Sequence, residues 1–241
     1  MDNERPAGRA MCFRCRRPVV TCLCAQITPI ATRTHFVLLT HPMEYRRDKV
    51  GTGRAAQLSI TTSELRVGVD FTGDARLRAL LADPSLDCRL LYPGDNAVNL
   101  SRARYVPERG RRLVLFVVDA TWPCAKKVLR SSPNLARLPR VGFDVERRSE
   151  FAIKHQPHPE CLSTIESLDR VLICLAASGY ESWEPDDSER LLRPFRKMVE
   201  MQTRYASDPD VSSYRTSRPY TLPSERRPSL KHSRRGVFAR D

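Results

Sequence analysis

The sequence lacks a long hydrophobic run. No stretch of its 241 residues approaches the roughly 20 apolar residues that a membrane-spanning helix needs. An apolar segment is also missing near the N-terminus, where residues 1–6 read Met-Asp-Asn-Glu-Arg-Pro, and this argues against a signal peptide. These absences predict a cytoplasmic protein that does not enter a membrane.

Acidic residues are few relative to basic ones. The chain carries 41 Lys and Arg against 28 Asp and Glu, which gives a formal net charge of +13. A folded protein this basic repels itself, and a polyanionic partner is the usual reason for tolerating that repulsion. Nucleic acid is therefore the first candidate partner. An anionic membrane surface is the second, weakened by the missing apolar run.

Short apolar runs alternate with helix-like segments along most of the chain, and no internal repeat is visible. Runs that are rich in Val, Leu and Ile and end in loop residues are typical of buried parallel strands. The alternation predicts an α/β fold, with a mostly parallel sheet and helices on both faces. The expected strands span 35–40, 65–69, 88–92, 113–118 and, less clearly, 138–143; the expected helices span 54–58, 75–81, 122–130, 164–177 and 188–205.

The length and a hydrophobic content of 41% suit one good-sized domain with a small appendage. We expect a zinc-binding segment over residues 1–27, a catalytic domain over 28–206 and a basic, flexible tail over 207–241. Ser, Pro and Arg dominate the tail. It is either a solubilising terminus or a salt-sensitive phosphate-binding arm, and the sequence leaves both readings open.

Four of the eight cysteines crowd into one short segment with the pattern Cys-x2-Cys-x6-Cys-x-Cys. In a reducing compartment such cysteines are not expected to form disulfides. Four thiolates in one tight loop suit tetrahedral zinc, and a site filled by four cysteines has no open position, so its role is structural. The predicted zinc ligands are Cys12, Cys15, Cys22 and Cys24.

Arginines 14, 16 and 17 lie in the same segment, which is either a small RNA-contacting knuckle or a stabilising staple. The other four cysteines, which have apolar neighbours, are interpreted as buried thiols without a further role.

Ligands of open parallel sheets bind beyond the carboxyl ends of the strands. Asp119 follows the most apolar run of the chain, which places a half-desolvated carboxylate at the end of a central strand. Trp122 could stack on a base or an adenine ring, or pack in the core. Other polar residues here also have structural readings: Ser163 and Glu166 form a capping-box pattern, and Thr121 is placed to cap a helix.

Several ordered motifs together resemble the DTW-domain family. They are the four-cysteine cluster, His41-Pro42-x-Glu44, Gly51-Thr52-Gly53, Leu91-Tyr92-Pro93-Gly94, Asp119-x-Thr121-Trp122, Gln156-Pro157 and Ser163-Thr164-Ile165-Glu166. They span about residues 12–180, which is nearly the whole expected folded part. The chain departs from the family pattern at Gly51, Ala120, Lys154 and Ser167.

The resemblance implies a tRNA-uridine aminocarboxypropyltransferase. Such enzymes move the 3-amino-3-carboxypropyl group of S-adenosylmethionine to N3 of a uridine in tRNA and release methylthioadenosine. The implied fold is related to the SPOUT class, whose C-terminal part is a trefoil knot. The alternatives are a SPOUT-like RNA methyltransferase and a non-catalytic, zinc-bearing RNA-binding protein. The tRNA species, the uridine position and the oligomeric state stay open.

With this activity in view, we expect three groups of site residues. The catalytic residues would be Asp119 and Trp122, with Asp119 acting either as a base or as an orienting group. The cofactor would be held by Tyr92, Pro93, Gly94, Asp119, Thr121, Ser163, Thr164 and Glu166. The RNA would be bound by His41, Glu44, Arg46, Arg47, Lys126, Lys127, Arg130 and Lys154.

Overall fold

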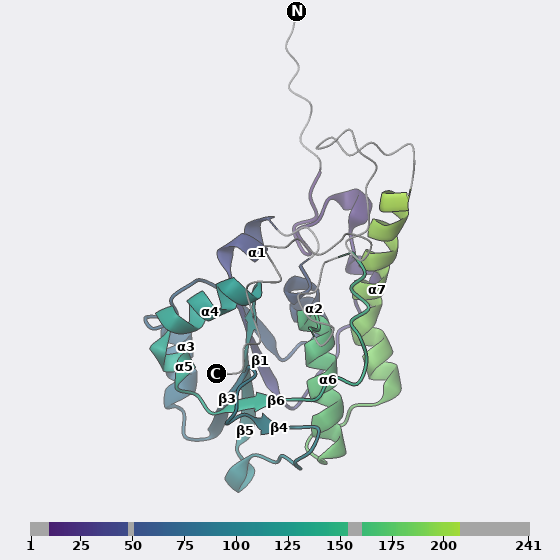
Figure 1. Ribbon diagram of the computed structural model, residues 1–241. Coiled ribbons are helices and arrows are strands. Elements are labelled where there is room, and N and C mark those ends of the chain that lie inside the picture. Colours follow the sequence, from purple (N-terminus) through teal and green to yellow (C-terminus); the bar gives the residue numbers. More distant parts are fainter. Residues whose placement is uncertain (1–9, 48–50, 154–160, 208–241) are drawn as a thin grey trace, which may run out of the picture.

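The computed structural model describes residues 10–47, 51–153 and 161–207 (Figure 1). Its described strands form one six-stranded sheet in which all paired strands run parallel, in the order β2-β1-β5-β3-β6-β4. This confirms the predicted α/β class. The strands are β1 His35–Thr40, β2 Ser63–Val67, β3 Leu86–Leu91, β4 Val98–Asn99, β5 Arg112–Asp119 and β6 Arg140–Gly142.

Helices cover both faces of the sheet. In Figure 1, α3, α4 and α5 lie on one side of the strands, and α2, α6 and α7 lie on the other. Within the described residues, no helix has both the length and the apolar character that crossing a membrane requires. The helices are α1 Pro42–Arg47, α2 Gly53–Ser59, α3 Ala75–Ala82, α4 Trp122–Ser131, α5 Pro133–Ala136, α6 Thr164–Ala177 and α7 Pro185–Ser207.

The central strand β5 is apolar on both faces because each face meets a separate hydrophobic core. Leu113, Leu115 and Val117 belong to the core beneath α2, α6 and α7. Val114 and Phe116, on the alternate positions, belong to the core beneath α3, α4 and α5. Successive side chains of a strand point to opposite faces, so a strand covered on both sides needs an unbroken apolar run.

The long elements agree best with the sequence prediction. Strand β1 and helix α6 have the predicted bounds, while β2 begins and ends two residues earlier than expected. Strand β4 and helices α1 and α5 were not predicted. These elements contain two, six and four residues, too few for a hydrophobic period to emerge, and depend on neighbouring elements for their stability.

A buried polar contact joins the last two helices. The indole N–H of Trp183 donates to Asp169 Oδ1 at 3.1 Å and lies 3.0 Å from Ser188 Oγ. Both Trp183 and Asp169 are buried. Burial raises the pKa of Asp169, because a carboxylate loses its hydration there, although hydrogen bonds from Ser188 and Trp183 oppose the rise.

Asp169→Asn should match or exceed the wild-type free energy of unfolding at pH 7, by up to about 1 kcal/mol, because the amide oxygen still accepts from Trp183 and no charge is buried. The raised pKa means that the folded state keeps a proton that the unfolded state has already lost. The contribution of Asp169 to the free energy of unfolding of the wild type therefore falls as pH rises from about 3.9 toward the raised pKa.

Urea unfolding at pH 7 and pH 4 measures this difference, and any advantage of the Asn variant should shrink at pH 4. The matched Asp169→Ala variant, which removes an acceptor, should lose about 1–3 kcal/mol at both pH values. Equal destabilisation of the Asn and Ala variants at pH 7 would contradict the account.

Candidate active site

A pocket of about 270 Å³ lies where strands β5, β3 and β6 end and helices α4 and α6 begin. Its volume is close to the lower end of the roughly 300–1,000 Å³ typical of ligand pockets. The wall is mostly apolar and includes Val117, Val141 and Phe143, and polar groups reach it from Thr164 and Ser167. Apolar walls with few polar groups at the carboxyl edge of a parallel sheet are typical of a small-molecule site.

Two aromatic rings form one wall of this pocket. Tyr92 and Trp122 make an edge-to-face contact, with ring centroids 5.8 Å apart. The Arg140 guanidinium lies 5.4 Å from the centroid of the Tyr92 ring and donates to the carbonyl of Pro93 at 3.3 Å. Burial raises the pKa of Tyr92, so its phenol is neutral at pH 7. The predicted residues Tyr92, Pro93 and Trp122 thus meet at the pocket, beside Gly94, which approaches Arg140 closely.

The Asp119 side chain is buried, with 8% of the residue exposed, and does not line this pocket. Its Oδ2 accepts a hydrogen bond from Thr40 Oγ1 at 3.0 Å, and its Oδ1 accepts one from Thr164 Oγ1 at 2.7 Å. Because Thr40 ends β1 and Thr164 begins α6, one carboxylate joins three elements. This geometry favours the orienting role of Asp119 over the role of a base.

Gly53 makes the Asp119 arrangement possible. A Cβ atom on Gly53 would lie 2.2 Å from Asp119 Oδ2, well inside contact distance. Only glycine therefore allows the first turn of α2 to pack against the carboxylate. Gly53 belongs to the Gly51-Thr52-Gly53 motif of the sequence, whereas no motif of the sequence includes Thr40. Thr40 and Asp119 are paired across β1 and β5. Each is a polar residue at the end of an apolar run, and this shared position is the sequence signal that could have predicted their contact.

Ser163 and Glu166 form the predicted capping box at the start of α6. Both are buried, and Glu166 also accepts hydrogen bonds from Ser149 Oγ and from the backbone N–H of Glu150, each at 2.7 Å. These contacts tie the loop before α6 to the helix, which gives both residues a structural role. Thr121 is the N-cap residue of α4 and is exposed. Of the residues expected to hold the cofactor, only Tyr92, Pro93 and Thr164 line the pocket.

His41 is buried rather than available at the surface. Its backbone N–H donates to the Asp119 carbonyl at 3.1 Å, and its Nδ1 accepts from the N–H of Met43 at 3.2 Å. Burial, helped by the charge of Lys127, lowers the pKa of His41 and keeps its ring neutral. This side chain supports the start of α1, and its predicted RNA contact does not fit such burial.

Exposed basic residues near the site come from α1, from α4 and from the segment after β6, where Arg147 and Arg148 follow the pocket residue Val145. Arg46 on α1 and Lys126, Lys127 and Arg130 on α4 are exposed, and Glu44 is partly exposed. The side chain of Arg47, the whole of Lys154 and the tail from residue 208 lie outside the described residues. The charge of Lys127 is close enough to act on His41, so the basic face of α4 adjoins α1.

The four cysteines of the N-terminal segment converge as predicted. The Sγ atoms of Cys12 and Cys24 are 3.7 Å apart, those of Cys15 and Cys22 are also 3.7 Å apart, and all four lie within 4.8 Å of one another. Zinc–sulfur bonds of about 2.3 Å in a regular tetrahedron separate the sulfurs by about 3.8 Å. All eight cysteines of the chain are free thiols. The residues present therefore fit a zinc ion.

The surroundings favour a thiolate at Cys12 but oppose one at Cys22 and Cys24, whose pKa values are raised, that of Cys24 to about 12 and chiefly by burial. Hydrogen bonds from the backbone N–H of Cys15, from the Cys22 thiol and from the backbone N–H of Arg14 lower the pKa of Cys12 to about 6. Arg16 has a φ of 60°, which turns the chain sharply after the first cysteine pair. Metal ligation requires deprotonated cysteines, so at Cys22 and Cys24 the charge of the ion itself would have to stabilise the thiolates.

The cysteine segment packs against the helices that cover the sheet. Leu23 is buried in the core of the α6–α7 side. Arg17, which is also buried, donates to Met198 Sδ at 2.8 Å and approaches the carbonyl of Gly51 at 3.4 Å. Of the three arginines in this segment, Arg17 is thus buried and stabilises the structure, while Arg14 and Arg16 are exposed.

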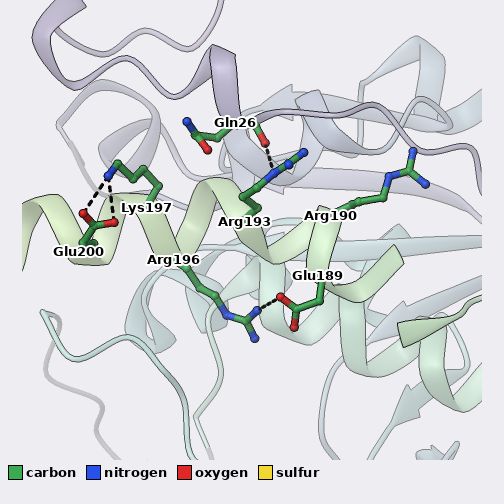
Figure 2. Close-up of a pocket in the computed structure, with 7 residues that line it drawn as sticks. All are labelled: Gln26, Glu189, Arg190, Arg193, Arg196, Lys197 and Glu200. Atoms are coloured by element: carbon green, nitrogen blue, oxygen red, sulfur yellow. Dashed lines mark hydrogen bonds and ion pairs between the residues drawn. The ribbon is translucent and has the colours of Figure 1, made fainter. Parts of the chain in front are cut away.

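A larger hollow of about 610 Å³ lies along the outer face of α7, but its charged groups bond within the protein (Figure 2). Arg196 pairs with Glu189 at 2.5 Å, and Lys197 pairs with Glu200 at 2.8 Å. Arg193 donates to the carbonyl of Gln26 at 3.2 Å. Ion pairs within α7 and hydrogen bonds from Arg193 to the Gln26 segment therefore occupy the polar groups of this hollow, and the smaller apolar pocket is the better ligand site.

The DTW domain family model matches residues 9–203 of the chain. The chain is similar to tRNA-uridine aminocarboxypropyltransferase 2 of Drosophila melanogaster, with 32% identity over 209 residues that cover 84% of this chain and 78% of that protein. It is also similar to tRNA-uridine aminocarboxypropyltransferase A of Arabidopsis thaliana, with 28% identity over 85% of this chain and 86% of that protein.

The Mus musculus tRNA-uridine aminocarboxypropyltransferase 2 is 27% identical over 85% of this chain and 67% of that protein. No solved structure matches the chain significantly. The family match covers more than half of the chain and includes both the cysteine segment and the pocket. This chain therefore belongs to the DTW domain family.

Proposed function

We propose that the protein transfers the 3-amino-3-carboxypropyl group of S-adenosylmethionine to N3 of a uridine in tRNA and releases methylthioadenosine. The observation that carries this proposal is the family match over residues 9–203, joined by relatives that are named for this activity. The pocket at the carboxyl edge of the sheet supplies a place for the donor.

When bound, S-adenosylmethionine supplies a sulfonium that makes its attached carbons electrophilic. The Tyr92–Trp122 wall offers aromatic faces and edges to a flat ring such as adenine. Thr164, the first residue of the 14-residue helix α6, lines the pocket, and its hydroxyl donates to Asp119. The amino end of such a helix attracts a carboxylate, which suits the amino-acid part of the donor.

Asp119 acts in this proposal as a positioning residue. Its carboxylate holds the hydroxyls of Thr40 and Thr164, and so fixes the end of β1, the end of β5 and the start of α6 relative to one another. Group transfer from a sulfonium depends on which carbon faces the nucleophile in line, and small misplacements of the donor are costly. A tie between these three elements therefore protects the geometry of transfer.

The exposed cations of α1 and α4 would bind tRNA phosphates. Arg46, Lys126, Lys127 and Arg130 carry four positive charges beside the site, and phosphate contacts of this kind position a nucleic acid without reading its sequence. Zinc would be held by the four cysteines and would act as a structural cross-link, since no coordination position stays open. The knot stays a prediction, because residues 154–160 between β6 and α6 lie outside the described residues.

Purified protein incubated with unmodified tRNA and S-adenosylmethionine should yield a nucleoside that carries the aminocarboxypropyl group, together with an equal amount of methylthioadenosine. Mass spectrometry of digested tRNA and of the small-molecule fraction measures both products. Release of S-adenosylhomocysteine instead would identify a methyltransferase. Donor binding without either product would leave the transfer unsupported, and absence of donor binding by calorimetry would favour a pure RNA-binding protein.

Gly53→Ala should lower kcat at least about 10-fold, because the new Cβ displaces the Asp119 carboxylate and loosens the positioning of the donor. The matched control is Gly73→Ala, where an added Cβ meets nothing within 4 Å. Steady-state kinetics and a thermal melt of each variant test this expectation. Wild-type kcat in a folded Gly53→Ala protein would contradict the assigned role of Asp119.

Cys12→Ser should release zinc, because three thiolates hold the ion less tightly than four, and should lower the melting temperature of the protein. The control is Cys88→Ser, which changes a cysteine on β3 far from the cluster in sequence. Elemental analysis should find about one zinc per chain in the wild type and in the control. Full zinc content in Cys12→Ser would refute the four-cysteine site.

A further inference from the structure

The loop between the first two cysteines presents a fully exposed aromatic ring. Phe13 is 97% exposed, although Cys15, two residues later, is buried. Antiparallel contacts fix the base of this loop: Met11 bridges Pro18, and the N–H of Cys12 donates to the carbonyl of Arg17 at 2.8 Å. A Phe that packs against nothing gives up the stabilisation of about 1.5–3 kcal/mol that burial would provide. Met11, Val19 and Val20 of the same segment are exposed too, and a group of exposed apolar side chains on a fixed loop points to a ligand surface.

The surroundings of Phe13 are cationic. Residues 10–27 contain three arginines and no Asp or Glu. Arg14 and Arg16 are exposed, and the Arg16 guanidinium lies 4.2 Å from the centroid of the Tyr45 ring on α1. An aromatic face beside exposed guanidinium groups matches single-stranded nucleic acid, which offers both flat bases and phosphates. The exposed Met11, Val19 and Val20 add apolar area to this surface, but arginines without any neighbouring carboxylate in residues 10–27 favour a polyanion over a protein partner.

The loop also adjoins the candidate active site. The guanidinium of Arg54 donates to the carbonyl of Arg14 at 2.9 and 3.1 Å. Arg54 follows Gly53, which packs against the Asp119 carboxylate. In Figure 1 the purple cysteine segment lies beside α1, the helix that follows the carboxyl end of β1. A nucleotide on this loop would therefore be held at the carboxyl edge of the sheet, the edge at which the pocket lies.

We propose that Phe13 is a stacking platform for an unpaired base of the RNA substrate, with Arg14 and Arg16 binding the adjacent phosphates. This inference rests on the proposed function for the identity of the RNA as tRNA. It adds a specificity element: the substrate must expose an unstacked base near the uridine that is modified. Bases of a continuous helix are stacked on one another and are not open to the ring.

Phe13→Ala should weaken binding of unmodified tRNA and of a single-stranded oligonucleotide roughly 5- to 100-fold, which is the loss expected for one base stack. Affinity for a fully paired RNA stem should change less than 2-fold, because that duplex offers phosphates but no free base. The matched control is Val20→Ala, which removes another exposed apolar side chain of the same segment, 78% exposed. Fluorescence anisotropy without S-adenosylmethionine measures the affinities, and elemental analysis checks that zinc is retained.

Phe13→Trp should keep the RNA affinity of the wild type, because Trp also stacks on a base. Its added tryptophan should contribute fluorescence that single-stranded RNA quenches, on top of the signal from the native Trp122 and Trp183. Equal tRNA affinity for Phe13→Ala and Val20→Ala would overturn the proposal, as would equal losses on the single strand and the stem. Unchanged RNA affinity combined with loss of self-association would identify a protein contact instead and would also overturn it. Because these measurements omit the donor, failure of the stacking site and failure of the proposed transfer are separate outcomes.

Discussion

The Asp119 carboxylate is the contact on which the candidate site depends. It sits at the end of the central strand, accepts hydrogen bonds from Thr40 and Thr164, and packs against the Cα of Gly53. Through these partners it joins β1, β5, α2 and α6 at the edge where the pocket lies. A buried carboxylate destabilises the folded state unless its oxygens accept hydrogen bonds. The positions of Thr40 and Thr164 relative to Asp119 are therefore closely constrained. The same restriction is useful to an enzyme that must present a single carbon of its donor.

The cysteine segment is part of this structure rather than a separate module. Leu23 contributes to the main core, and Arg17 reaches Met198 on the longest helix. On its outer side the same segment exposes Phe13 and Arg14, while the carbonyl of Arg14 is held by Arg54 next to the site. A metal cross-link can keep such a short, Arg-rich loop ordered where few apolar contacts are available. The segment thus connects a candidate RNA surface to the catalytic edge of the sheet.

Charge is distributed unequally over the molecule. Along α7 the cations are largely matched by carboxylates, as Arg196 is by Glu189 and Glu150. Lys126 and Lys127 on α4, and Arg14 on the cysteine loop, have exposed side chains toward which a polyanion can approach. The net charge of +13 alone therefore does not locate the RNA surface. The larger hollow is rich in arginine and still lacks the character of a binding site, because Arg190, Arg196 and Lys197 pair with carboxylates and Arg193 bonds to neutral oxygens of Gln26 and Thr28.

The sequence by itself determined the α/β class, the convergence of four cysteines, the capping box of α6 and the position of Asp119 at a strand end. Each of these follows from local pattern: hydrophobic period, ligand spacing or cap chemistry. Only the tertiary structure decided that Glu166 and His41 are buried and structural, that Thr40 and Gly53 surround Asp119, and that Arg17 faces inward. The physical reason is that burial and hydrogen-bond partners depend on residues far apart in the chain, whose approach is set by the packing of two helix layers on one sheet.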